Sequence, residues 1–239
     1  MFKKISDKLK VFWSGDYNIL LLFLILLFVF RPSNQGIFYI VFWQLIFAGV
    51  LISSIFNCRH RMITKVLTAL LAVPAVLFNW MALTFESSFV IGLFLLFSFL
   101  FILVIATSIV NEVILHAKVT LSTLRGVVCA YFLLGFSFAF GYCLIEYFVP
   151  NSFTALFPEP LVLAHTHYLS ELIYFSFITL LTIGYGDITV VSEIARSLAV
   201  VEGIIGQFYI AILVARIVAV YTYYSEKEVF PKAPRRKRR

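Results

Sequence analysis

Thr179–Asp187 reads TLLTIGYGD, and this stretch decides how the chain is organised. Gly184 and Gly186 alternate with larger residues, and glycine adopts positive φ about as readily as negative φ. A backbone with that freedom can turn several successive carbonyl oxygens to one side. Such oxygens can replace the water around a cation, and the Thr182 hydroxyl can add a further ligand. The stretch therefore predicts a cation-binding loop made of backbone carbonyls.

The composition places the rest of the chain in a lipid bilayer. Of the 239 residues, 62% are hydrophobic and 13% are charged, whereas a soluble domain is about half apolar and about a quarter charged. A membrane-spanning helix needs about 20 apolar residues, so the length fits about six spans and no large soluble domain. No small-residue cleavage site follows the first apolar run, which indicates a retained helix rather than a signal peptide.

Six apolar runs are predicted to be transmembrane helices: residues 18–30, 37–56, 66–85, 89–110, 124–148 and 197–221. The first run is short, and its helix begins either at Asn18 or further back, near Val11. The fourth run ends either at Val110 or further on, at Leu115. A seventh run, Leu169–Thr182, has about 14 residues, which is typical of a re-entrant segment rather than a span. The sequence thus predicts an all-α membrane protein with six transmembrane helices and a re-entrant helix between helices five and six.

The basic residues predict the orientation. With a cytoplasmic N-terminus, 16 of the 19 Lys and Arg residues lie on the inner side, as the positive-inside rule requires. These residues are Lys3, Lys4, Lys8, Lys10, Arg59, Arg61, Lys65, Lys118, Arg125, Lys227, Lys232, Arg235, Arg236, Lys237, Arg238 and Arg239. Both termini are then cytoplasmic, and residues 184–187 lie at the outer face.

Residues 125–224 resemble the pore module of the potassium channel superfamily, which has an outer helix, a pore helix, a filter and an inner helix. The resemblance rests on Gly184-Tyr185-Gly186 together with helix context, segment length and sidedness. It implies that K⁺ is the permeant ion, with no cofactor, and that the filter is built by Thr182, Ile183, Gly184, Tyr185 and Gly186, the first four as K⁺ ligands. One such motif is a quarter of a ring, so the resemblance implies a homotetramer. The whole chain resembles a small prokaryotic six-helix channel of the cell membrane, in bacteria the inner membrane.

Other functions are weighed against a channel. A transporter would more often show an internal repeat with paired broken helices, and none is visible. An enzyme would need His, Asp, Glu or Cys clustered on one membrane face, and the polar residues are too scattered for that. A non-conducting accessory subunit or a transporter remains the alternative to a potassium channel, and an enzyme is not expected.

Several polar residues are assigned supporting roles around the filter. In the family, a carboxylate after the filter accepts hydrogen bonds from pore-helix aromatic residues, which implies a pair between Asp187 and Tyr174. Glu171 is predicted in the first turn of the pore helix, where a carboxylate favours the helix dipole, or else as a solvated surface charge. Glu202 is predicted behind the filter, bonded to Ser176 or Thr179, with a protonated and purely structural carboxyl as the alternative.

The last helix is predicted to carry the gate. Gly206 lies 19 residues after Asp187, at a position that resembles the gating hinge of the family, and glycine weakens a helix by about 1 kcal/mol relative to alanine. For Gly203 we favour close helix packing. Four further residues recur at helical spacing and are predicted to line the cavity: Gln207, Ile210, Val214 and Val218.

The chain is predicted to have four parts: an amphipathic cytoplasmic segment (1–17), a four-helix region (18–115), the pore module (116–224) and a basic tail (225–239). Phe89–Val110 contains no Lys or Arg, which excludes an arginine-based voltage sensor in that helix. The tail and the N-terminal lysines are expected to attract anionic lipid headgroups rather than nucleic acid. Three cysteines are interpreted as structural thiols: Cys58, Cys129 and Cys143.

Overall fold

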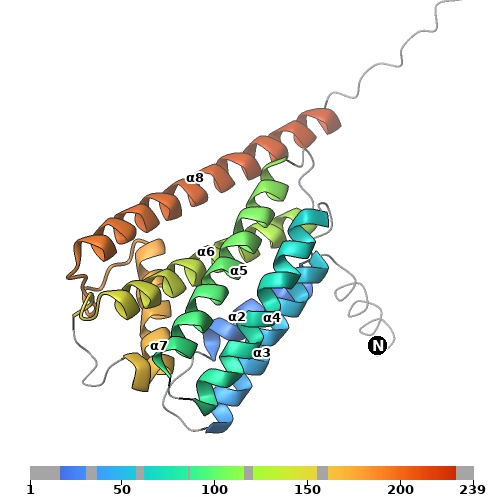
Figure 1. Cartoon of the computed structure of the whole chain (residues 1–239). Helices are drawn as coiled ribbons and strands as arrows, with labels where there is room; N and C mark the ends of the chain where they lie inside the picture. Colours follow the sequence, from blue (N-terminus) through green and yellow to red (C-terminus); the bar gives the residue numbers. More distant parts are fainter. Residues whose placement is uncertain are drawn as a thin grey trace, which may run out of the picture.

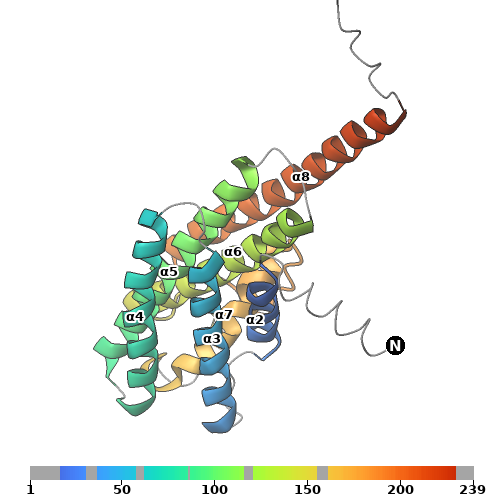
Figure 2. The ribbon, with the colours of Figure 1, turned by 90° about the vertical axis from the view of Figure 1, so that its right-hand side faces the viewer.

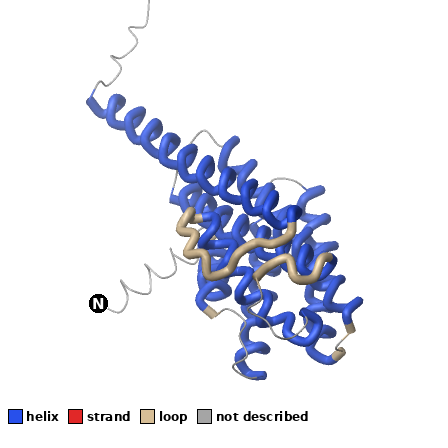
Figure 3. Tube along the Cα trace, turned by 90° about the vertical axis from the view of Figure 1, so that its left-hand side faces the viewer, coloured by secondary structure: helices blue, strands red, loops and turns tan. Residues whose placement is uncertain are grey.

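The computed structural model describes residues 17–30, 37–57, 62–85, 87–115, 121–154 and 161–229. Within these ranges there are seven helices: α2 (Asn18–Val29), α3 (Ile37–Asn57), α4 (Met62–Thr84), α5 (Ser88–Leu115), α6 (Leu121–Phe148), α7 (Leu161–Leu180) and α8 (Glu193–Val229). Phe153 and Val190 form an isolated antiparallel bridge, and the described chain is otherwise helices and connecting loops (Figure 3). The predicted all-α architecture is therefore confirmed. The N-terminal segment and most of the basic tail lie outside the described residues.

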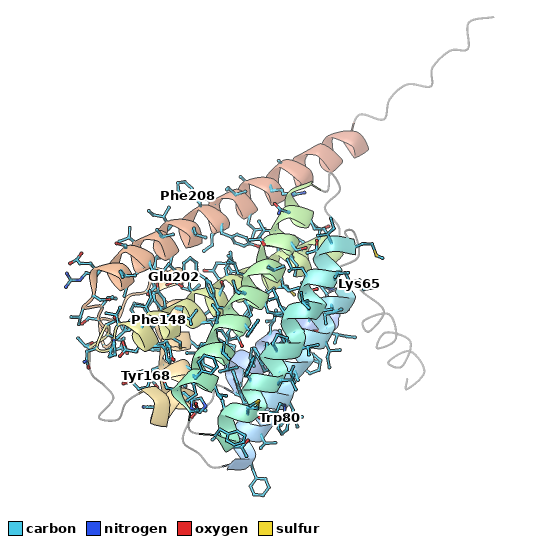
Figure 4. All side chains as sticks on the ribbon, in the orientation of Figure 1. Lys65, Trp80, Phe148, Tyr168, Glu202 and Phe208 are labelled. Carbon is cyan, nitrogen blue, oxygen red and sulfur yellow. The ribbon has the colours of Figure 1, made fainter. Side chains whose placement is uncertain are left out.

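Five of the described helices are long and apolar enough to cross a membrane. They are α3, α4, α5, α6 and α8, with apolar windows Phe38–Ile55, Met62–Ala82, Ser88–Glu112, Thr123–Phe148 and Glu193–Leu213. The helix α2 is equally apolar, but it has 12 residues. Figure 4 shows Lys65 and Trp80 at opposite ends of α4, as expected for a helix that crosses from one interface to the other. The count of six spans stays a prediction, because α2 falls short of a full span.

The helix α7 differs from its prediction. It has 20 residues and begins at Leu161, not near Leu169, so the predicted length of about 14 residues was wrong. The error arose because the first half of α7 contains polar residues such as His165 and His167, which break the apolar pattern without breaking the helix. Glu171 consequently lies in the middle of α7, and the first turn contains no acidic residue.

Figure 1 shows how the helices are grouped. The helix α8 lies along one side of the bundle, where it contacts α6 and α7, while α5 and α2 pack on other parts of α6. With 37 residues, α8 is about 55 Å long, and its C-terminal part projects beyond the other helices in Figures 1 and 2. Of the five apolar helices, α8 is therefore the one least enclosed by the rest of the chain.

Aromatic side chains join the N-terminal helices to α6 and α7. Phe28 of α2 lies 4.6 Å from Phe177 of α7 and 5.9 Å from Phe132 of α6, measured between ring centroids. Phe47 of α3 lies 5.9 Å from Phe140 of α6. The two helices differ in burial, because 61% of the apolar window of α6 is buried and only 11% of the apolar window of α8 is buried. Within one chain, α6 is central, and few of the described side chains of α8 are buried.

Candidate functional site

The backbone of Thr182–Gly186 alternates in the sign of φ. Thr182, Gly184 and Gly186 have φ of 57°, 57° and 80°, whereas Ile183 and Tyr185 are not among the described residues with positive φ. When conformations alternate in this way, successive N–H groups point to one side, and the carbonyl groups point to the other. The two glycines adopt positive φ without strain, while for Thr182 this conformation costs about 1 to 2 kcal/mol.

Hydrogen bonds define which side the N–H groups face. Thr182 donates its N–H to the Thr179 carbonyl at 2.9 Å, and Ile183 donates to the Ile178 carbonyl at 2.8 Å. Gly184 also donates to the Ile178 carbonyl, at 3.3 Å. The N–H groups of Thr182, Ile183 and Gly184 thus face the end of α7, and the alternating sign of φ predicts that the carbonyl groups of the loop point the other way. This is the arrangement that a row of carbonyl ligands requires.

The predicted hydrogen bond between Tyr174 and Asp187 is present. The Tyr174 hydroxyl donates to Asp187 Oδ2 at 2.6 Å, and the Ile188 N–H donates to Asp187 Oδ1 at 3.0 Å. Because the hydroxyl stabilises the ionised carboxylate, it holds the pKa of Asp187 below its usual value. The two bonds attach the end of the loop to the middle of α7.

A second carboxylate, which the sequence analysis missed, lies near the C-terminal end of α6. Glu146 is buried, and its two oxygens accept the N–H groups of Asn151 at 2.8 Å and Ser152 at 2.9 Å. The residues that follow this turn pair with the segment after the loop: Thr154 donates its N–H to Thr189, and Val191 donates to Ser152. Glu146 therefore stabilises the turn after α6, and this turn pairs with the segment that follows Asp187.

Glu202 joins three helices. Its side chain is completely buried, and it contacts Ser176 of α7 through Oε1 at 2.5 Å and the Tyr142 hydroxyl of α6 through Oε2 at 2.5 Å. Of the two predicted partners, the structure thus contains the contact with Ser176, and Thr179 instead offers its backbone carbonyl to Thr182. Tyr142 was not anticipated, because nothing in the sequence relates two residues 60 positions apart.

The end of α7 is in close contact with α6 and α8. The Tyr131 hydroxyl donates to the Leu180 carbonyl at 3.2 Å, which satisfies a carbonyl group that the helix itself leaves free. The Gln207 side chain of α8 lies next to the loop, with its amide nitrogen 3.4 Å from the Thr182 hydroxyl. Ile210 is 41% exposed within the single chain. The side chains of the other two predicted cavity residues, Val214 and Val218, lie outside the described part of the structure.

The two glycines of α8 differ in how closely they approach other helices of the same chain. Gly203 was expected to allow close helix packing, but a Cβ atom at this position would meet no heavy atom within 4 Å in the described chain. Gly206 makes the close approach instead, against the end of α7. Of the three cysteines, Cys129 and Cys143 are free and buried, as expected for structural thiols, and Cys58 is outside the described residues. Among the described residues no group of His, Cys, Asp or Glu could hold a metal ion.

Residues 128–223 match a family described as "Ion channel". The match indicates an ion channel. It runs from α6 through the Thr182–Gly186 loop into α8, so it includes every contact described above except those of the N-terminal helices. A channel is not an enzyme, which agrees with the sequence prediction, and with five apolar helices it indicates a multi-pass membrane protein. Comparisons of the whole chain with curated proteins and with solved structures found no match.

Proposed function

We propose that this channel is potassium-selective and that its filter is the backbone of Thr182–Gly186. The observation that carries the proposal is the direction of the N–H groups: three consecutive N–H groups are bonded to α7, and a backbone that alternates in the sign of φ then turns its carbonyl oxygens away from that helix. Carbonyl oxygens held in this way can replace the hydration shell of K⁺. Thr182, Ile183, Gly184 and Tyr185 then supply the ligands, and no cofactor is needed.

We propose further that four copies of the chain assemble around the filter. One chain supplies one row of carbonyls, which cannot surround an ion. Its surface is consistent with neighbours, because Tyr185 is 71% exposed, and so are large apolar residues on α8 such as Phe208, at 64%. Figure 4 shows Phe208 on the side of α8 that faces away from the bundle. Four such helices around one axis would bring Gln207 and Ile210 to the wall of a central cavity.

The loop geometry supports a re-entrant pore segment. The bridge between Phe153 and Val190 brings the outer end of α6 together with the start of α8. Residues 149–192 therefore leave and return at the same side of the two apolar helices, with α7 and the filter between them. In this proposal α2 is the sixth span, both termini are cytoplasmic in a cell membrane, and the filter faces outward.

The proposal is tested by cation flux in liposomes that contain the purified full-length channel. We expect influx of thallium, a K⁺ substitute, and a permeability for K⁺ well above that for Na⁺. Empty liposomes are the control, and chemical crosslinking gives the number of chains. Equal permeability for K⁺ and Na⁺ would overturn the selectivity. A tetramer that passes no ion would favour the accessory-subunit alternative.

A further inference from the structure

We propose that Glu202 is a positioning residue that acts as a protonated carboxylic acid, donates a hydrogen bond to Ser176, and so ties α8 to the helix that carries the filter. The proposal deepens the proposed function, because it names a group that supports the filter from behind. The proton on Glu202 is inferred from hydrogen-bond geometry and from burial, so it can be tested independently of ion selectivity.

The hydroxyl of Ser176 lies next to two oxygen atoms but carries a single proton. The Ser176 Oγ atom lies 2.7 Å from the Gly135 carbonyl oxygen and 2.5 Å from Glu202 Oε1. A serine hydroxyl has one proton, and a carbonyl oxygen can only accept. The serine proton is therefore used for Gly135. The proton in the short contact between Ser176 and Oε1 must come from the carboxyl group of Glu202.

The other carboxyl oxygen completes the count. Glu202 Oε2 lies 2.5 Å from the Tyr142 hydroxyl, which supplies its own proton. The three contacts need three protons, and three are present only when Ser176, Tyr142 and Glu202 each carry one. An ionised Glu202 would leave two protons for three contacts, so Ser176 would have to give up either Gly135 or Glu202.

The surroundings of Glu202 lead to the same protonation state. The side chain has no exposed area, and its partners in the described chain are the two hydroxyls, with no Lys or Arg among them. The other titratable group that faces it is Tyr131 of α6, whose hydroxyl is used by the Leu180 carbonyl. A buried ionised carboxylate without a cationic partner is strongly disfavoured, whereas a neutral acid with satisfied hydrogen bonds is not.

The position of this contact relates it to the filter. Ser176 lies two residues before Ile178, whose carbonyl accepts the N–H groups of Ile183 and Gly184. Glu202 lies one helical turn before Gly206, which contacts the end of α7. Figure 4 shows Glu202 on the side of α8 that faces the bundle. The Glu202 side chain therefore contacts the same turn of α7 whose backbone accepts hydrogen bonds from the filter.

The test compares substitutions that keep or remove the donor. In Glu202→Gln the amide NH₂ can donate to Ser176 and its oxygen can accept from Tyr142, so we expect K⁺ flux and K⁺/Na⁺ selectivity within about twofold of the natural channel. Glu202→Ala and Ser176→Ala remove the hydrogen bond, and we expect selectivity to fall about tenfold. Ser170→Ala, at another buried serine of α7, is the matched control and should have little effect.

Infrared difference spectroscopy reads the proton directly and does not depend on conduction. We expect the natural channel to show the C=O stretch of a protonated carboxyl, which Glu202→Gln removes and which Glu193→Gln, at an exposed carboxyl of α8, retains. Absence of that band from the natural channel would overturn the proposal even if the channel is potassium-selective. If Glu202→Gln reduced K⁺/Na⁺ selectivity as much as Glu202→Ala does, the proposal would also be overturned. Should the channel conduct without selectivity, the infrared result would still decide the protonation of Glu202.

Discussion

Gly206 of α8 lies against the backbone carbonyl of Leu180, the last residue of α7. A Cβ atom at Gly206 would overlap with that oxygen and would lie 3.1 Å from the Leu180 Cδ1 atom. At Gly203, about one turn earlier, the same Cβ atom would meet nothing within 4 Å in the described chain. The absence of a side chain at position 206 therefore lets α8 approach the helix that precedes the filter. This contact gives Gly206 a packing role, and its role as a hinge stays a prediction.

The contact predicts opposite effects of alanine at the two glycines. Alanine favours a helix by about 1 kcal/mol over glycine, so Gly203→Ala should leave the melting temperature unchanged or raise it. Gly206→Ala should lower it, because overpacking against a backbone atom costs about 1 to 3 kcal/mol. Thermal unfolding in detergent, followed by circular dichroism, makes the comparison. Equal melting temperatures for the two variants would show that the close approach is not a constraint.

The filter glycines are predicted to be intolerant for a different reason. A Cβ atom at Gly184 or Gly186 would meet no heavy atom of the described residues within 4 Å, but both glycines have positive φ. Alanine in this conformation costs about 1 to 2 kcal/mol, so Gly184→Ala or Gly186→Ala should turn the carbonyls out of line and abolish selective K⁺ flux. Gly203→Ala is the matched control, since its surroundings are equally open but its backbone is helical. A filter variant with intact selectivity would contradict the assignment of the filter.

Most helix ends were predictable from the sequence, because apolar runs and the breakers between them reflect what a bilayer accepts. The helices α2, α3 and α6 lie within three residues of their predicted runs at each end. The helix α7 was not predictable in the same way. Its first half contains polar residues such as His165 and His167, and hydropathy alone does not predict a membrane helix there.

The candidate site likewise contains some features that the sequence predicted and others that depend on tertiary structure. The spacing of the glycines identified the Thr182–Gly186 loop, and the resemblance to the family implied the pair of Tyr174 and Asp187. The contacts of Glu202 with Tyr142 and of Glu146 with Ser152 depend on how helices meet and how a turn folds back. A single sequence also could not separate Ser176 from Thr179, because residues three apart lie on one face of a helix.

The bond between Tyr174 and Asp187 predicts how the filter responds to acid. This bond lowers the pKa of Asp187 in the folded channel below its reference value of 3.8. The stabilisation it provides is therefore complete above that value, and it is lost as the pH falls through the lower, folded-state pKa. We expect K⁺ flux to be unchanged between an external pH of about 7 and about 5, and to be lost only in stronger acid.

Two variants check this response. Tyr174→Phe removes the hydroxyl donor, so the loss of flux should move to higher pH, toward the reference value of 3.8. Asp187→Asn cannot ionise and should remove the acid response of the filter. Flux measured in liposomes across a series of external pH values gives both results. An identical acid response in Tyr174→Phe and the natural channel would show that the hydroxyl does not control Asp187.

Glu146 is predicted to respond to glutamine in the opposite way to Glu202. Both oxygens of Glu146 accept backbone N–H groups, and glutamine has only one accepting oxygen. Glu146→Gln should therefore leave one buried N–H unsatisfied and cost about 1 to 3 kcal/mol. We expect a lower melting temperature and faster hydrogen exchange at Asn151 or Ser152, while Glu193→Gln, at an exposed site, stays near the natural value. Full tolerance of Glu146→Gln would show that the turn does not depend on the carboxylate.

The basic tail is predicted to couple the end of α8 to anionic lipid. The helix α8 continues to Val229 and projects beyond the bundle (Figure 2), so the end of α8 connects the tail directly to the part of the channel that would open. Seven basic residues follow Tyr224: Lys227, Lys232, Arg235, Arg236, Lys237, Arg238 and Arg239. Each is worth about 1 kcal/mol near an anionic surface, and salt screens the attraction over about 8 Å at physiological ionic strength.

A comparison of three chains in neutral and anionic liposomes tests this coupling. The chains are the full-length channel, a channel that ends at Glu228, and a full-length channel in which residues 235–239 are glutamine. We expect anionic lipid to change K⁺ flux severalfold in the full-length channel, less at high salt, and little in the other two. The glutamine variant keeps the length of the tail, so it separates charge from the mere presence of a tail. If all three chains respond equally to anionic lipid, the tail serves only to fix the orientation of α8 in the membrane.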